Sequence, residues 1–130
     1  MAAYTRGRVE PNGVRSVARV RAVRARRGDV CWVALDPVVG TEIQKARPAI
    51  IVSNDAMNQF AGRVVVVPVT SNVEQCHPGE ALVTIKGKPA RALGDQVRSI
   101  DKARLRGRLD TLVMAELRQV EEALRITLVL

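Results

Sequence analysis

The sequence predicts a small, mainly β domain, an antiparallel barrel that one C-terminal helix completes. Three observations lead to this fold class. The chain has 130 residues, of which 47% are apolar, enough for one domain with a real core. Several short apolar segments are separated by turn residues. The only sustained helical period comes at the C-terminal end, and the absence of alternating strand–helix units argues against a parallel doubly wound sheet.

Six short segments rich in β-branched and other apolar residues predict strands, because turn residues bound each of them. The predicted strands are 30–35, 48–53, 64–69, 81–85, 92–99 and 105–109. Between the first two, residues 38–47 are polar and lack a sustained period, which predicts a long exposed loop of the kind that usually carries function. Asn54 is expected to cap a single helical turn that runs to Phe60. Residues 101–104 are expected to form a tight turn.

One amphipathic helix is expected to close the chain. Asp110 and Thr111 offer an N-cap, and apolar residues then recur at helical spacing while charged residues occupy the rest of the wheel. The apolar positions are Val113, Leu117, Val120, Leu124 and Leu128.

The formal net charge of +8 is concentrated near the N-terminus. Residues 1–27 hold eight arginines and one acid, whereas residues 28–130 hold 13 basic and 12 acidic residues. We therefore divide the chain into a basic, flexible arm over residues 1–26 and a nearly neutral domain over residues 27–130. Three interpretations of the arm stay open: a flexible grip on nucleic acid, an amphipathic targeting segment, and a start codon assigned too far upstream.

The inventory of reactive residues excludes several mechanisms. His77 is the only histidine, so neither a two-histidine ribonuclease mechanism nor a histidine-rich metal site can be built within one chain. A phosphate-binding glycine-rich loop is missing, and neither a metal nor another cofactor is expected. Two cysteines without an apolar leader predict reduced thiols in a cytoplasmic protein. No apolar run approaches the roughly 18 residues of a membrane helix.

A set of polar residues remains in the long loop and at the ends of predicted strands. Ordinary turn and edge chemistry explains each one taken alone, because Ser, Thr, Asn and Asp satisfy local backbone groups. They form a site only if the strand ends meet in space. These residues are Glu42, Gln44, Arg47, Ser53, Asn54, Thr70, Ser71, Asp95, Gln96, Arg98 and Ser99.

Several blocks of this sequence, in the right succession, resemble the MazF/PemK toxins. The resemblance covers residues 27–128 and ends in the closing helix. Its blocks are RGDV at 27–30, LDPVVGTE at 35–42, RPAIIVSND at 47–55, VVPVTS at 66–71 and DQVRSIDKARL at 95–105.

The resemblance implies an SH3-like or CcdB-like barrel that pairs into a homodimer. Members of this family are cytoplasmic mRNA interferases of type II toxin–antitoxin modules. By resemblance, this chain cleaves single-stranded RNA at a short recognition sequence without a metal, leaves a 2′,3′-cyclic phosphate and a 5′-hydroxyl, and is inhibited by a cognate antitoxin.

The resemblance also implies site residues. Arg47 and Thr70 correspond to the catalytic pair, and Glu42 corresponds to a third participant in the loop. Such cleavage needs help in deprotonating the ribose 2′-hydroxyl, a donor to the leaving oxygen and positive charge at the phosphate. Arg47 supplies the charge, while the Thr70 hydroxyl orients the phosphate or the attacking oxygen. The residues expected to contact RNA are Thr41, Asn54, Gln96 and Arg98.

Two alternatives stay open beside the ribonuclease interpretation. The first is a catalytically inactive SH3-like module that only binds an antitoxin. The second is a CcdB-like gyrase inhibitor, which is disfavoured because those toxins resemble one another in a tryptophan near the C-terminus, whereas the sole tryptophan here is Trp32. Residues 43–46 replace the Gln-Gly type stretch common in the family, so the target RNA sequence does not carry over.

Overall fold

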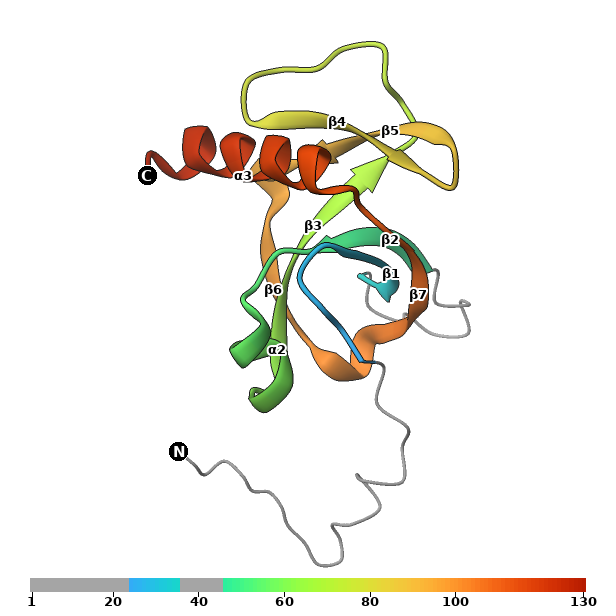
Figure 1. Cartoon of the computed structure of the whole chain (residues 1–130), viewed down its shortest axis with the longest axis vertical. Helices are drawn as coiled ribbons and strands as arrows, with labels where there is room; N and C mark the ends of the chain where they lie inside the picture. Colours follow the sequence, from blue (N-terminus) through green and yellow to red (C-terminus); the bar gives the residue numbers. More distant parts are fainter. Residues whose placement is uncertain (1–23, 36–45) are drawn as a thin grey trace, which may run out of the picture.

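The computed structural model describes residues 24–35 and 46–130. Within them, strands form a curled antiparallel sheet, and a C-terminal helix lies against it (Figure 1). The strands are β1 (Asp29–Ala34), β2 (Ala46–Ile51), β3 (Arg63–Thr70), β4 (Glu80–Ile85), β5 (Lys88–Leu93), β6 (Arg98–Asp101) and β7 (Leu105–Thr111). The helices are α2 (Asp55–Phe60) and α3 (Met114–Leu128), with 3₁₀ turns η1 (Gly94–Gln96) and η2 (Lys102–Arg104). The predicted fold class, mainly β with a C-terminal helix, is confirmed.

Strand β3 is the centre of the sheet, whose order is β4-β5-β3-β2-β1-β7 with β6 also paired to β3. Every described pairing is antiparallel. The first half of β3 pairs with β6, from Arg63 opposite Asp101 to Val66 opposite Arg98. Its last two residues pair with β5 instead. One strand therefore joins two parts of the sheet that diverge from each other.

The buried side chains form two clusters on opposite faces of the same strands. On β1, Val30 belongs to the cluster beneath α3, whereas Cys31 and Val33 belong to the cluster inside the curl. The same alternation places Val67 in the first cluster and Val66 in the second. Because these strands are covered on both faces, their sequences are continuous apolar runs rather than alternating ones.

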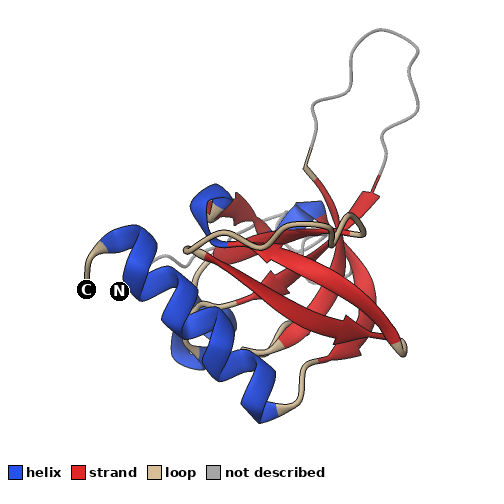
Figure 2. Ribbon diagram, turned by 90° about the horizontal axis from the view of Figure 1, so that it is seen from above, coloured by secondary structure: helices blue, strands red, loops and turns tan. Residues whose placement is uncertain are grey.

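Helix α3 covers one face of the sheet (Figure 2). Leu117, Val120 and Ala123 are its buried residues and pack in the first cluster. The predicted apolar stripe is wrong at both ends, because Val113 is 62% exposed and Leu128 is 51% exposed. The buried residues of α3 therefore lie in the middle of the helix, which packs against β4 and η1.

The predicted N-cap of this helix is wrong, because Asp110 and Thr111 belong to β7. Their side chains make tertiary contacts instead. The Asp110 carboxylate accepts a hydrogen bond from the Lys86 amide at 2.7 Å, and the Thr111 hydroxyl donates to Asp29 at 3.1 Å. The helix begins after Val113, whose side chain makes no capping hydrogen bond.

The predicted fifth strand over 92–99 is also wrong. Strand β5 covers Lys88–Leu93, the chain then turns through η1, and β6 begins at Arg98. The turn brings Gly94 so close to the Gly79 carbonyl that a Cβ atom there would lie 2.3 Å from its oxygen. A close backbone contact, which the local sequence pattern does not record, divides the apparent strand.

Residues 24–28 contact the barrel, and the first three of them belong to the predicted arm over residues 1–26. Ala25 packs against the cluster inside the curl. The Arg27 amide donates to Asp55 at 2.8 Å, the Gly28 amide donates to the Ile51 carbonyl at 2.8 Å, and Arg27 forms a 2.7 Å ion pair with Glu121. Most of the predicted arm, residues 1–23, lies outside the described residues.

Among the described helices, none is long and apolar enough to cross a membrane.

Candidate active site

The candidate site begins where two prolines end the ladder between β2 and β3. These strands pair only from Ala49 opposite Pro68 to Ile51 opposite Val66. Beyond that point β3 pairs with β5, and the first half of β2 pairs with β1 alone. Neither Pro48 nor Pro68 has an amide N–H that could extend the ladder. The two strands separate, and a groove opens between them.

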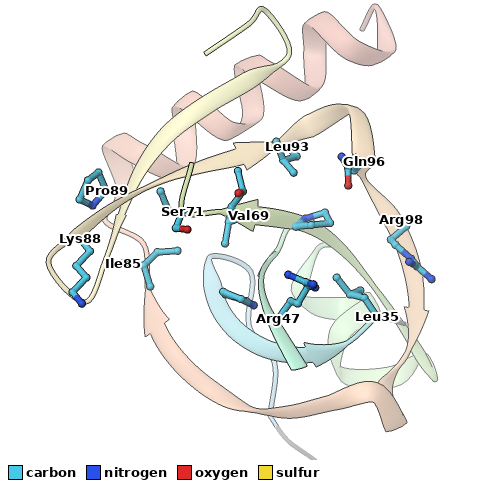
Figure 3. A pocket seen from close by; sticks show the side chains of 14 residues that line it. Leu35, Arg47, Val69, Ser71, Ile85, Lys88, Pro89, Leu93, Gln96 and Arg98 are labelled. Atoms are coloured by element: carbon cyan, nitrogen blue, oxygen red, sulfur yellow. The ribbon is translucent and has the colours of Figure 1, made fainter. Parts of the chain in front are cut away.

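The groove has a volume of about 740 Å³, and its walls combine charged, polar and apolar side chains. Its apolar surface includes Leu35, Val69, Ile85 and Leu93. In the view of Figure 3, Lys88 and Arg98 stand at opposite ends and Arg47 lies between them. The polar and charged lining residues are Arg47, Thr70, Ser71, Lys88, Gln96 and Arg98.

Four of the predicted site residues line this one groove although they come from four elements. Arg47 lies on β2, Thr70 ends β3, Gln96 ends η1, and Arg98 begins β6. The loop predicted over 38–47 is wrong at its end, because Arg47 lies in β2, opposite Val33 of β1. Strand pairing fixes its backbone, so the guanidinium projects from a rigid element.

The other residues that the resemblance implies are not part of the described groove lining. Thr41 and Glu42 lie outside the described residues. Asn54 caps α2, where its side-chain oxygen accepts a hydrogen bond from the Met57 amide at 2.7 Å. The predicted capping role is therefore confirmed, and the described groove lining does not include Asn54.

The hydroxyl of Thr70 is held by its neighbours and still has a proton to donate. It is half-buried, and its oxygen accepts a hydrogen bond from the Asn72 amide at 3.2 Å. A threonine hydroxyl can accept two hydrogen bonds and donate one. The contact with Asn72 leaves the donor function available, which suits a hydroxyl that orients a phosphate oxygen.

Lys88 is a groove residue that the sequence interpretation missed. It begins β5 after a two-residue turn at Lys86 and Gly87, both with positive φ, and it pairs with Ile85. A lysine beside a turn is ordinary surface chemistry, so its position in the sequence alone does not mark it. The groove therefore carries three cations, from Arg47, Lys88 and Arg98, and no carboxylate among its described lining.

No described group of three or more His, Cys, Asp or Glu side chains is placed to hold a metal ion. His77 lies in the loop before β4, where its amide donates to Glu80 at 3.0 Å. Cys31 is buried, and this burial raises the pKa of its thiol to about 11. The described polar chemistry of the groove is therefore that of guanidinium, ammonium, hydroxyl and amide groups.

Residues 26–128 match the family model of PemK-like, MazF-like toxins of type II toxin–antitoxin systems. The chain belongs to this family. Endoribonuclease MazF9 of Mycobacterium tuberculosis is 40% identical over 112 residues, which cover 79% of this chain and 95% of that relative. Endoribonuclease EndoA of Bacillus subtilis is 33% identical over 110 residues, which cover 81% of this chain and 95% of EndoA.

Solved structures of this family share the fold. A MazE-MazF crystal structure from Deinococcus radiodurans matches with a TM-score of 0.69 and 28% identity, covering 82% of this chain and 97% of the other. A mycobacterial endoribonuclease in complex with its cognate antitoxin matches with a TM-score of 0.67 and 25% identity, covering 81% of this chain and 95% of the other. The predicted membership of the MazF/PemK family is confirmed.

Proposed function

We propose that this protein is a toxin that cleaves single-stranded RNA at a short recognition sequence without a metal. The observation that carries the proposal is the convergence of Arg47, Thr70, Gln96 and Arg98 on one cationic groove. The names of the MazF9 and EndoA relatives, both endoribonucleases of which this chain covers 95%, support the same activity. An inactive binding module needs no such convergence of donors, so it is the weaker alternative.

In the proposed reaction, the ribose 2′-oxygen attacks the adjacent phosphorus and the bond to the 5′-oxygen breaks. One proton leaves the 2′-oxygen and one reaches the 5′-oxygen, which yields a 2′,3′-cyclic phosphate and a 5′-hydroxyl. Arg47 stabilises the negative charge that develops on the phosphate oxygens. Thr70 donates a hydrogen bond that orients the phosphate. Glu42, shortly before β2 in the chain, is proposed as a third participant in proton transfer.

Recognition of the RNA is proposed for two side chains of the groove and for two further polar residues. Gln96 offers both a donor and an acceptor, as reading of an unpaired base edge requires. Arg98 is proposed to contact the RNA backbone, and Thr41 and Asn54 are proposed as further contacts with the RNA. With so few aromatic residues in the chain, hydrogen bonds rather than stacking carry the selectivity.

The proposed partner is a cognate antitoxin that occupies the groove. The solved complexes of a mycobacterial endoribonuclease and of MazE-MazF support a partner of this kind. We also propose a homodimer in the cytoplasm, as expected for this family of toxins.

A cleavage assay in EDTA tests the function. Purified protein incubated with a long unstructured RNA is expected to produce discrete cuts whose upstream fragments end in a cyclic phosphate. Arg47→Ala should slow cutting by about 10² to 10³-fold, because it removes one charged donor from the transition state. Thr70→Val should also slow it, whereas Thr70→Ser, which keeps the hydroxyl, should retain most of the rate.

Arg118→Ala is the matched control, because this exposed arginine of α3 lies outside the groove lining. It should cut at the wild-type rate. If Arg47→Ala cuts as fast as Arg118→Ala, the assignment of the site is wrong. Wild-type protein that binds an antitoxin but cuts no RNA would instead identify the inactive module, and inhibition of gyrase supercoiling would identify the CcdB-like alternative.

A further inference from the structure

A second cavity, of about 410 Å³, lies beside α2 where residues 24–26 meet the barrel. We call it the Lys102 pocket. None of its lining residues also lines the groove with Arg47 and Thr70. Its charged and polar lining residues are Arg24, Arg26, Asp55, Asn58, Gln59 and Lys102.

Main-chain hydrogen bonds hold several of the segments that carry these residues. The Lys102 amide donates to the Gly62 carbonyl at 3.0 Å, which ties η2 to the turn after α2. The Arg26 amide donates to Asp29 at 3.0 Å, and the Arg27 amide donates to Asp55 at 2.8 Å. The base of the basic segment is therefore held against the barrel, and the backbones that carry Arg26 and Lys102 are pre-organised around one cavity.

The charges in the Lys102 pocket are unbalanced. Three cations, Arg24, Arg26 and Lys102, face one carboxylate. The Asp55 carboxylate already accepts hydrogen bonds from the Arg27 amide and from the Asn58 side chain at 3.2 Å. Within residues 24–35 and 46–130, the three cationic side chains form no ion pair. Burial lowers the pKa of Lys102, as expected for an ammonium group that has lost water without gaining an anion.

Strand β6 connects this pocket to the proposed active site. Arg98, which lines the groove, begins β6, and Lys102 follows directly after its end. Four residues of extended strand place these two positions about 13 Å apart. Exposed Arg63, whose Cα lies opposite that of Asp101, lies near the same end of the strand and donates to the Ser99 hydroxyl at 2.8 Å. An RNA strand has a negative charge at every nucleotide, so one that occupies the groove has further phosphates within reach of the pocket.

We propose that the Lys102 pocket binds a backbone phosphate of the RNA, several nucleotides from the bond that is cut. This inference rests on the proposed ribonuclease function and adds a second contact to it. Phosphate contacts position a strand without reading its sequence. The pocket therefore adds affinity for long RNA and leaves the recognition sequence to the groove.

The test compares two double variants that remove the same charge. The double variant Arg26→Gln with Lys102→Gln removes two of the three positive charges that line the pocket. Lys86→Gln with Arg118→Gln is the control, since neither residue lines either cavity. Binding is measured by fluorescence anisotropy as a function of salt. The probe is a 2′-O-methylated single strand of about 20 nucleotides that contains the mapped cut sequence and cannot be cleaved, because its 2′-oxygens are blocked.

The pocket variant is expected to bind the long strand roughly threefold more weakly than the control at 50 mM salt. Its slope of log K against log salt concentration should be lower in magnitude by about 0.7, which is the value for the loss of one phosphate contact on a single strand. A probe of about five nucleotides around the cut should bind both variants equally, because it does not reach the pocket. Arg26→Lys with Lys102→Arg keeps the charge and should restore the wild-type slope. Cut positions should be the same in all variants.

If the pocket and control variants show equal salt dependence of binding to the long strand, the inference is wrong. Discrete cutting by wild-type protein in the same experiments would leave the proposed function intact. An unchanged RNA slope combined with weaker antitoxin binding also overturns it, since the pocket then serves a protein partner. Wild-type protein that neither cuts nor binds RNA refutes both proposals. Circular dichroism and the melting temperature establish that each variant is folded.

Discussion

Replacing Gly94 with alanine tests the close backbone contact that turns the chain between β5 and β6. Gly94 is buried and begins η1, the turn that carries Gln96 to the groove. A Cβ atom at this position would lie 2.3 Å from the Gly79 carbonyl oxygen and 3.5 Å from the Thr127 hydroxyl. Because ordinary contact begins near 3.4 Å, the two backbone segments would have to separate by about 1 Å in a close-packed interior.

Overpacking of this kind costs about 1–3 kcal/mol of folding free energy, and a contact with backbone belongs at the upper end of that range. Gly62→Ala is the matched control, because a Cβ atom at Gly62 meets nothing within 4 Å. That control should be stabilised by about 0.5 kcal/mol through the lower entropy of its unfolded chain. The two variants are therefore expected to differ by about 3 kcal/mol in unfolding free energy, measured by urea titration.

The outcome that refutes this reasoning is a Gly94→Ala protein whose unfolding free energy lies within about 1 kcal/mol of that of Gly62→Ala. The backbone at Gly94 would then be free to adjust, and η1 would not be held in place by packing. If the expected loss is found and the variant still folds at low temperature, its cleavage of mapped RNA sites should weaken, because the shift displaces Gln96.

Three further predictions follow from other parts of the molecule. Hydrogen bonds from the Lys86 and Thr111 amides hold the pKa of Asp110 below its usual value, so stability falls as the pH drops below about 4 and this carboxylate is protonated. The urea midpoint of wild-type protein should fall more steeply there than that of Asp110→Asn, and equal slopes would contradict the prediction. At pH 8, Ellman's reagent should rapidly label exposed Cys76 alone, because Cys31 is buried with a pKa of about 11; two rapidly reacting thiols would be inconsistent with that burial. Deleting residues 1–23 should weaken RNA binding chiefly at low salt without moving the cut sites, and moved cut sites would assign the arm to recognition.

Much of the fold could be predicted because its elements are determined locally. Apolar runs such as 64–69, in which every residue except Pro68 is valine, form strands that are buried on both faces. The observed strand β3, Arg63–Thr70, is longer than the prediction by one residue at each end. The Asn54 cap of α2 depends on side chain and amide groups three residues apart, so its sequence pattern was sufficient.

The errors lie where distant segments decide the local structure. Asp110 and Thr111 have the chemistry of a helix cap, but their partners are Lys86 and Asp29. Arg47 belongs to a polar segment that lacks strand character, yet pairing with β1 makes it part of β2. In both cases a long-range hydrogen bond or ladder outweighed a weak local preference.

By itself, the sequence determined the fold class, the family and the identity of Arg47, Thr70, Gln96 and Arg98 as candidates, because these depend on residue types and their order along the chain. Only the tertiary structure decided that the four residues share a groove, that Lys88 joins them, and that Arg24 and Arg26 lie beside Lys102. The physical reason is that a groove is a property of strand pairing. Prolines at 48 and 68 are ordinary in the sequence, and they open the sheet only because β2 and β3 meet at that register.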